Sequence, residues 1–218
     1  MKYALFDWDG TLVDSMPFWH ALPRRYCEQK GAAWYPELDR VIGAYTMVQA
    51  AQAITRLLNL EQTPQQTFAE LKEMVRRAYW EEIPLKPGVA DTLAAFRRAG
   101  VKMGIASASD RELIASTLPR LGIEGYISAV RTCTDTGDGR GKDESPEVYR
   151  ECLRDLGGDP AAPGDAVIFD DALFAARTAT AAGFTVAGVF EQSNPRQEEL
   201  KKACRYYFVN AAEWRTLL

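Results

Sequence analysis

Two aspartates that follow a short apolar run are the feature that most constrains this chain. The run, Tyr3 to Phe6, has the length and composition of a buried β-strand, and Asp7 and Asp9 come directly after it. Open α/β folds place their chemistry at the carboxyl ends of their strands. Because side chains alternate along a strand, Trp8 is expected to point away while Asp7 and Asp9 share one site.

The pair of carboxylates indicates a particular chemistry. Two carboxylates held close together repel each other and need a cation, a shared proton or solvent. A hard divalent ion such as Mg²⁺ suits oxygen ligands of this kind. Asp7 would then serve as a nucleophile that forms an aspartyl-phosphate, and Asp9 as the acid and base beside it. The alternative is structural, because Asp and Gly favour turns and Asp-x-Asp-Gly can simply end a strand.

The longer stretch around the two aspartates is more specific than the four-residue motif. Residues 6–15 read FDWDGTLVDS and resemble the first motif of the haloacid dehalogenase-like (HAD) hydrolase superfamily. The commonest members of that superfamily are Mg²⁺-dependent phosphatases. The resemblance therefore implies an enzyme with Mg²⁺ as its cofactor and a small phosphorylated metabolite as its substrate.

The composition narrows the class of protein further. The chain has 218 residues, which suits one medium domain or a core domain with a small insert. Its net charge of −4 gives no electrostatic reason to bind nucleic acid or an anionic membrane. No apolar run approaches a membrane span, and Asp7 and Asp9 interrupt the early apolar segment, so we expect no signal peptide. The four cysteines form no C-x-x-C pair, which disfavours a zinc site and fits a reducing cytoplasm.

Residues 15–82 are expected to form a helical block. Its first helix should end at Gly31, and Pro23 inside it should kink or divide it. Capping boxes that begin at Thr46 and Thr63 predict two further helices. An insert directly after the Asp-x-Asp motif would lie over the site as a lid. The alternative is a helical subdomain that serves packing only. The block resembles the small helical cap of HAD phosphatases related to β-phosphoglucomutase and phosphoglycolate phosphatase.

From Pro84 onward, helical and strand patterns alternate. We expect strands at residues 101–106, 127–131, 166–169 and 184–189, and an edge strand with a short helix near the end of the chain. This order predicts an α/β fold with a doubly wound parallel sheet and right-handed crossovers. The expected division is a HAD-like, Rossmann-type core of residues 1–14 and 83–218, with residues 15–82 as the inserted helical cap.

A serine closes the second expected strand. Ser107 would lie beside the N-terminus of a helix, where a hydroxyl and free backbone N–H groups favour a phosphate. The alternative is that Ser107 and Ser109 merely cap that helix. HAD phosphatases carry Ser or Thr at this second motif, so the resemblance assigns phosphate binding to Ser107, and we assign Ser109 to the cap. Thr11 and the Gly10 backbone would assist in binding the phosphate.

A lysine lies in the charged, glycine-rich loop before the helix that Ser145 opens. Lys142 could neutralise a transferring phosphoryl group and the nucleophile. The alternative is an ordinary solvated lysine. Residues 141–149 resemble the third HAD motif but lack the usual proline directly after the lysine. The spacing from Lys142 to Pro146 is one residue longer than in the common form of that motif. Arg140 is the fallback if the loop has another register.

Adjacent acids follow the fourth expected strand. Asp170 and Asp171 would complete an oxygen-rich cation site beside the first strand. They could instead, or in addition, cap the next helix. The resemblance to the fourth HAD motif implies that Asp171 binds Mg²⁺ directly, together with Asp7 and Asp9. Asp170 stands where many relatives have Glu, and its shorter reach leaves its role open.

The sequence thus predicts a cytoplasmic, Mg²⁺-dependent phosphatase that works through an aspartyl-phosphate. A phosphomutase of the β-phosphoglucomutase type is the nearest enzymatic alternative. A non-catalytic HAD-like binding or regulatory protein is the alternative from another class, although every core acid is present. The related dehalogenases lack an acid at the position of Asp9, so a dehalogenase is less favoured. The sequence names neither the substrate nor the oligomeric state.

Overall fold

The apolar run before Asp7 forms a central strand of a six-stranded parallel sheet. The structure is a computed structural model that describes residues 1–44 and 46–218. The strand order is β3-β2-β1-β4-β5-β6, and every neighbouring pair is parallel. The strands are β1 (Tyr3–Phe6), β2 (Lys102–Ser107), β3 (Ile127–Thr132), β4 (Ala166–Asp170), β5 (Thr185–Val189) and β6 (Tyr206–Phe208).

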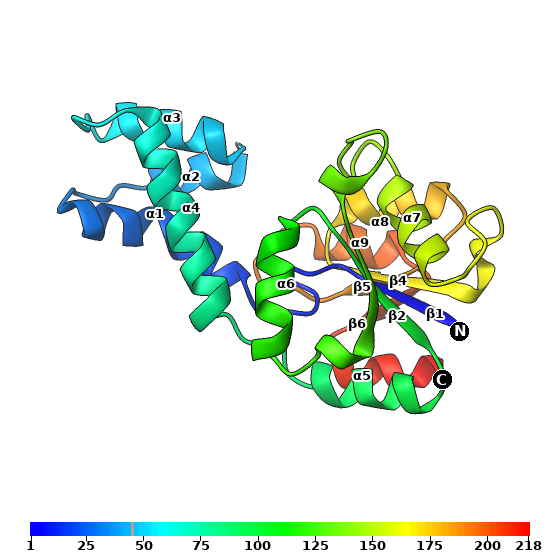
Figure 1. Ribbon diagram of the computed structural model, residues 1–218. Coiled ribbons are helices and arrows are strands. Elements are labelled where there is room, and N and C mark those ends of the chain that lie inside the picture. The colour runs from blue at the N-terminus through cyan, green and yellow to red at the C-terminus, as the bar shows by residue number, and fades with distance from the viewer. Residues whose placement is uncertain (45) are drawn as a thin grey trace. The chain divides into compact units, whose positions relative to one another are not determined.

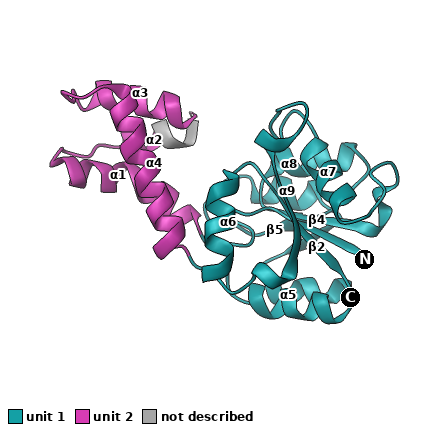
Figure 2. Cartoon of the chain, viewed as in Figure 1, with its two compact units in different colours: residues 1–14, 84–218 teal, residues 15–83 magenta. Residues whose placement is uncertain are grey.

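The chain divides into two compact units, shown in separate colours in Figure 2. One unit is residues 1–14 with 84–218 and contains the sheet; the other is residues 15–83 and is helical. Among the described residues, no helix has both the length and the apolar character needed to cross a membrane.

Helices cover both faces of the sheet, as the pattern of alternating elements predicted (Figure 1). α5 (Val89–Arg98) and the C-terminal 3₁₀ helix η4 (Ala211–Leu217) pack together on one face. The opposite face carries α7 (Glu147–Asp155), α8 (Leu173–Ala181) and α9 (Gln197–Ala203). The connections also contain α6 (Arg111–Arg120), η1 (Glu124–Tyr126), η2 (Cys133–Asp135) and η3 (Pro163–Asp165). The expected doubly wound α/β fold is confirmed.

Alternation along the central strands sends neighbouring side chains to opposite faces. Leu5 and Ile168 join an apolar cluster with α7, α8 and α9. Phe6 and Phe169, one residue further along, point to the other face, where they stack with ring centroids 4.9 Å apart. Trp214 of η4 lies against the same two rings, 5.7 and 4.9 Å away. The same alternation continues into the polar residues at the strand ends.

The helical unit contains α1 (Met16–Lys30), α2 (Glu37–Ala44), α3 (Met47–Leu57) and α4 (Pro64–Glu81). Gly31 ends α1 in the left-handed conformation, and both expected capping boxes are present, at Thr46 and Thr63. α1 continues through Pro23 as one helix, so Pro23 does not divide it. α2 was not singled out in the sequence. Tyr45 of this block lies outside the described residues.

One expected cap differs in the structure. We expected Ser109 to cap the helix that follows β2, but the N-cap of α6 is Asp110, whose carboxylate accepts from the N–H of Glu112. Both residues are good caps, so the sequence alone does not choose between them. The one-residue shift frees the side chain of Ser109 for another partner.

The buried aromatic cluster gives a test of the fold. Phe169→Ala should lower the free energy of unfolding by about 3–5 kcal/mol, because it leaves a cavity between Phe6 and Trp214. Phe174→Ala is the matched control, since Phe174 is 52% exposed and its removal should change stability by less than about 0.5 kcal/mol. Urea unfolding followed by tryptophan fluorescence measures both. Similar losses in the two variants would contradict this account of the core.

Candidate active site

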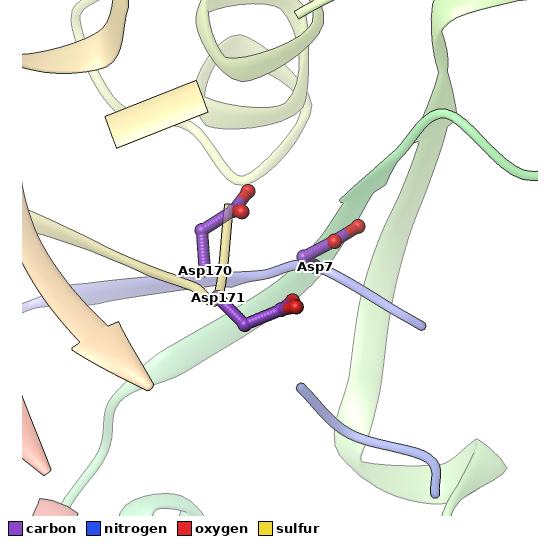
Figure 3. Close-up of side chains that lie close together, drawn as sticks. All are labelled: Asp7, Asp170 and Asp171. Atoms are coloured by element: carbon purple, nitrogen blue, oxygen red, sulfur yellow. The ribbon is translucent and has the colours of Figure 1, made fainter. Parts of the chain in front are cut away.

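Three carboxylates meet at the carboxyl edge of the sheet. Asp7 directly follows β1, Asp170 ends the neighbouring strand β4, and Asp171 comes next. Each offers an oxygen that lies within 4.8 Å of the other two. Figure 3 shows the three side chains lying close together. Phe6 pairs with Phe169 across the two strands, so their parallel register sets the acids level with each other.

A buried lysine joins two of these acids. The ammonium of Lys142 lies 2.7 Å from Oδ1 of Asp7 and 2.9 Å from Oδ2 of Asp170. The lysine side chain is 3% exposed, Asp7 is 14% exposed and Asp170 is fully buried. Lys142 is therefore not the ordinary solvated lysine of the alternative reading. A charge buried this deeply needs the partners it has here.

Asp170 is occupied by donors from the protein. Besides Lys142, the hydroxyl of Tyr149 donates to its Oδ2 at 3.0 Å. The N–H of Ala172 donates to its Oδ1 at 2.9 Å. Both oxygens of Asp170 thus have partners, which leaves Asp7 and Asp171 with the more available oxygens.

The site carries more negative charge than its lysine offsets. Burial raises the pKa of Asp7 to about 7, with Lys142 opposing this shift and Asp170 adding to it. Burial and the charge of Asp7 also raise the pKa of Asp171 well above its usual range. Burial alone would lower the pKa of Lys142, but Asp170 and Asp7 outweigh it and raise that pKa. Three carboxylates with one ammonium form a set that favours a further cation.

Asp171 points to the other side of the strand, toward the loop after β1. The hydroxyl of Thr11 donates to its Oδ1 at 3.0 Å. Gly10 adopts a positive φ of 73°, and a Cβ there would lie 2.6 Å from Oδ2 of Asp171. Only glycine fits this position, both for its backbone conformation and for its contact with Asp171. In this structure Thr11, expected beside a phosphate, contacts the carboxylate.

Asp9 lies outside the group of three. Its Oδ2 accepts a hydrogen bond from the hydroxyl of Ser109. It is near enough to Asp7 to contribute to the raised pKa of that group, as the last of several causes. Ser107 ends β2 and is buried, and its Oγ accepts from the N–H of Ser109 at 3.1 Å. Ser109 therefore links the expected phosphate-binding serine to the expected acid and base.

The loop before α7 holds Lys142 without the proline of the family motif. Asp138 accepts from the hydroxyls of Ser145 and Thr136, at 2.5 and 2.9 Å, and from the N–H of Arg140 at 3.2 Å. These bonds order the loop on the two sides of Lys142. Arg140 itself is exposed. The lysine, and not the fallback arginine, is the cation that the structure brings to the acids.

Two groups that contact the site were not predicted from the sequence. No role was predicted for Tyr149, yet its hydroxyl donates to Asp170. A hydroxyl on the otherwise apolar buried face of α7 was the available signal. Lys86 was not noted at all; its ammonium donates to the carbonyl of Gly10 at 2.6 Å. No pattern near Lys86 indicated that contact, because Gly10 is distant in the sequence.

Comparison with known proteins identifies the family. Residues 1–183 match the family described as haloacid dehalogenase-like hydrolase. The chain belongs to this family. The expected membership among HAD-like hydrolases is thus confirmed.

Individual HAD relatives are moderately similar. The phosphorylated carbohydrates phosphatase of Thermotoga maritima is 24% identical over 195 residues, which cover 89% of this chain and 88% of that protein. The phosphoglycolate phosphatase of Synechococcus elongatus is 33% identical over 137 residues, or 62% of each chain. The crystal structure of a Thermotoga maritima protein assigned as a β-phosphoglucomutase matches with a TM-score of 0.84 at 24% identity, covering 100% of this chain and 98% of that one. That last likeness is one of fold.

Substitution of the two basic residues tests the electrostatics of the site. Lys142→Met leaves Asp7 and Asp170 without their shared cation, so it should lower the free energy of unfolding by about 3 kcal/mol in metal-free buffer. Arg140→Met should change it by less than about 0.5 kcal/mol, because Arg140 is exposed. Chemical denaturation in the presence of a chelator measures both. Equal effects would show that Lys142 is not the cation on which these carboxylates depend.

Proposed function

We propose that this protein is a Mg²⁺-dependent phosphatase that hydrolyses a small phosphomonoester through an aspartyl-phosphate on Asp7. The observation that carries the proposal is the buried ammonium of Lys142, which bridges Asp7 and Asp170 beside a third carboxylate. A fixed cation next to a nucleophilic carboxylate suits phosphoryl transfer, where positioning and charge stabilisation supply most of the catalysis.

Each residue of the site has its own proposed role in the reaction. Lys142 holds Oδ1 of Asp7, which orients the carboxylate and leaves Oδ2 to attack the phosphorus atom. Asp9 protonates the leaving oxygen, then takes a proton from the water that hydrolyses the aspartyl-phosphate. Ser107 and Lys142 offset the charge of the phosphoryl group. Gly10 and Thr11 shape the loop that directly follows Asp9.

The donor set fits a hard divalent cation. The group of three offers only carboxylate oxygens, which Mg²⁺ prefers, and its net charge with Lys142 is negative. Asp7 and Asp171 are the proposed direct ligands, because both oxygens of Asp170 already accept from the protein. When bound, Mg²⁺ would neutralise charge on the phosphoryl oxygens. Asp9, outside the group, keeps its proposed role as acid and base.

The helical unit is proposed as a cap over the site. Its two connections leave the α/β unit at neighbouring points, since the N–H of Asp14 donates to the carbonyl of Pro84 at 2.9 Å. Insertion just after the nucleophile loop supports a role in excluding water and selecting substrates. The cytoplasm is the proposed location, because all four cysteines are free.

Relatives suggest the class of substrate. Two of them are named for phosphorylated carbohydrates and for phosphoglycolate. These are small, polar phosphomonoesters. We therefore propose a phosphorylated sugar or a small phosphorylated acid as the substrate of this protein.

Phosphate release from a panel of sugar, nucleotide and small-acid phosphates tests the reaction. We expect release with Mg²⁺, loss of release with chelator, and loss in Asp7→Asn, because an amide is a poor nucleophile. Asp165→Asn is the matched control, since Asp165 is an exposed acid paired with Lys2 and should leave activity unchanged. Activity that persists in Asp7→Asn would contradict the assigned nucleophile.

Other outcomes of that panel favour the alternatives. Interconversion of sugar phosphates with little free phosphate would support a phosphomutase. Tight binding of a phosphorylated ligand without turnover would support a binding or regulatory protein.

The role of Asp9 predicts a trapped intermediate. Asp9→Asn should slow breakdown of the aspartyl-phosphate by about 10²–10⁴-fold, the usual contribution of general acid–base catalysis. With a substrate whose leaving group needs no proton, such as an activated aryl phosphate, the phosphorylated protein should accumulate. Mass spectrometry of acid-quenched protein detects it. A variant that turns over as fast as the wild type would exclude Asp9 from this role.

A further inference from the structure

The half-buried Lys86 forms an ion pair with the buried Glu191 next to the site. Its ammonium lies 2.6 Å from Oε2 of Glu191, and the two side chains are 17% and 5% exposed. It also donates to the carbonyls of Gly10 at 2.6 Å and Phe190 at 3.0 Å. An ammonium has three N–H groups, so each has an acceptor here. An ion pair of this kind is weak evidence for stability, and here its lysine also binds two backbone carbonyls.

Glu191 connects this lysine to the loop between β5 and α9. Its Oε1 accepts from the N–H and the hydroxyl of Ser193, at 3.2 and 3.1 Å. Its carbonyl accepts from the N–H of Asn194 at 3.0 Å and from the side-chain amide of Gln197. The loop is thus tied to Lys86 at one end and to α9 at the other.

Asn194 carries the connection to the acids. Its side-chain amide donates to the backbone carbonyl of Asp171 at 2.7 Å. Lys86 holds the carbonyl of Gly10, and Gly10 leaves no room for a Cβ against the Asp171 carboxylate. The network therefore holds the backbone of Gly10 and the backbone of Asp171, whose carboxylate lies against Gly10.

We infer that Lys86, Glu191 and Asn194 are positioning residues that set the Asp171 carboxylate against Asp7 and so tune the affinity of the site for a divalent cation. We call Lys86, Glu191 and Asn194 the clamp. The clamp acts through backbone atoms and does not touch the cation or the substrate. The inference rests on the proposed function, because it assumes that the three carboxylates hold Mg²⁺.

The variants that test the clamp have to account for the opposite charges of Lys86 and Glu191. Lys86→Met alone would leave Glu191 buried without its cation and would also remove a positive charge near Asp171. The double variant Lys86→Met/Glu191→Gln removes one charge of each sign, so the local net charge stays the same and any change in affinity reports on geometry. Asn194→Ala removes the bond to Asp171 without any change of charge.

Two variants serve as matched controls. Lys102 also donates to a backbone carbonyl, that of Leu156 at 2.9 Å, but lies in β2 away from the acids. The side-chain amide of Asn210 donates to Glu213 at 2.7 Å, near the end of the chain. Lys102→Met and Asn210→Ala therefore remove comparable contacts elsewhere in the fold.

Mg²⁺ binding measured by calorimetry on the full chain, without substrate, is the test. We expect the dissociation constant to rise about tenfold in Asn194→Ala and in the double variant, which corresponds to about 1.4 kcal/mol. Both control variants should bind as the wild type does. Phosphatase activity of the clamp variants should recover at saturating Mg²⁺, a rescue that a merely structural defect would not show.

The outcomes separate the clamp from the metal site. If the wild type binds Mg²⁺ and both clamp variants bind it within twofold of the wild type, the clamp is overturned and the proposed function stands. If the wild type does not bind Mg²⁺, or if Asp171→Asn binds it equally well, the metal site is overturned and the clamp with it. Loss of activity that excess Mg²⁺ does not restore would also count against the clamp.

Discussion

The ammonium of Lys142 between Asp7 and Asp170 is the interaction on which the rest of the site depends. Moving three such charges out of water is expensive unless each finds a partner. The partners come from β1, from β4 and from the loop before α7, so these segments must converge for the charges to be satisfied. The strand order places β1 beside β4, and a parallel register brings their carboxyl ends level. The fold thus supplies the geometry that the charges require.

Asp170 and Asp171 are adjacent in the chain, and their side chains lie on opposite sides of the site. Asp170 follows the alternation of β4 toward the α7 side, where Tyr149 and Lys142 hold it. Asp171 lies toward the loop after β1, where Thr11 donates to it. The two acids look equivalent in the sequence, but both oxygens of Asp170 accept from protein donors. Among the described residues, Asp171 accepts at Oδ1 from Thr11, and its Oδ2 lies against Gly10. Strand alternation therefore gives adjacent aspartates different hydrogen-bond partners.

Local patterns predicted most of the fold, and contacts over long separations explain what they did not predict. Apolar runs and capping boxes depend on neighbours within a few residues, which is why the strands and the helices at Thr46 and Thr63 were found. Strand ends meet at one edge of a sheet, and Asp7, Asp170 and Asp171 lie together there as expected. Asp9, which was expected among the metal ligands, lies outside this group of three. It chose the wrong cap before α6, because Ser109 and Asp110 are both good caps and the bond from Ser109 to Asp9 decides between them. The contact of Lys86 with Gly10 spans 76 residues and has no local signal.

The two lysines near the acids differ in which carboxylates offset their positive charge. Lys142 pairs with Asp7 and Asp170, so its positive charge is offset by carboxylates of the group that would hold a cation. Burial raises the pKa of Asp171, and the charge of Lys86 opposes that rise as the last of its causes. The same charge would repel a cation at Asp171 if Lys86 stood alone. Its pairing with Glu191 cancels that charge at close range while leaving two N–H groups to hold the backbone carbonyls of Gly10 and Phe190. A neutral pair can therefore organise the loop without weakening the attraction of Asp7 and Asp171 for a divalent ion, which an unpaired lysine could not do.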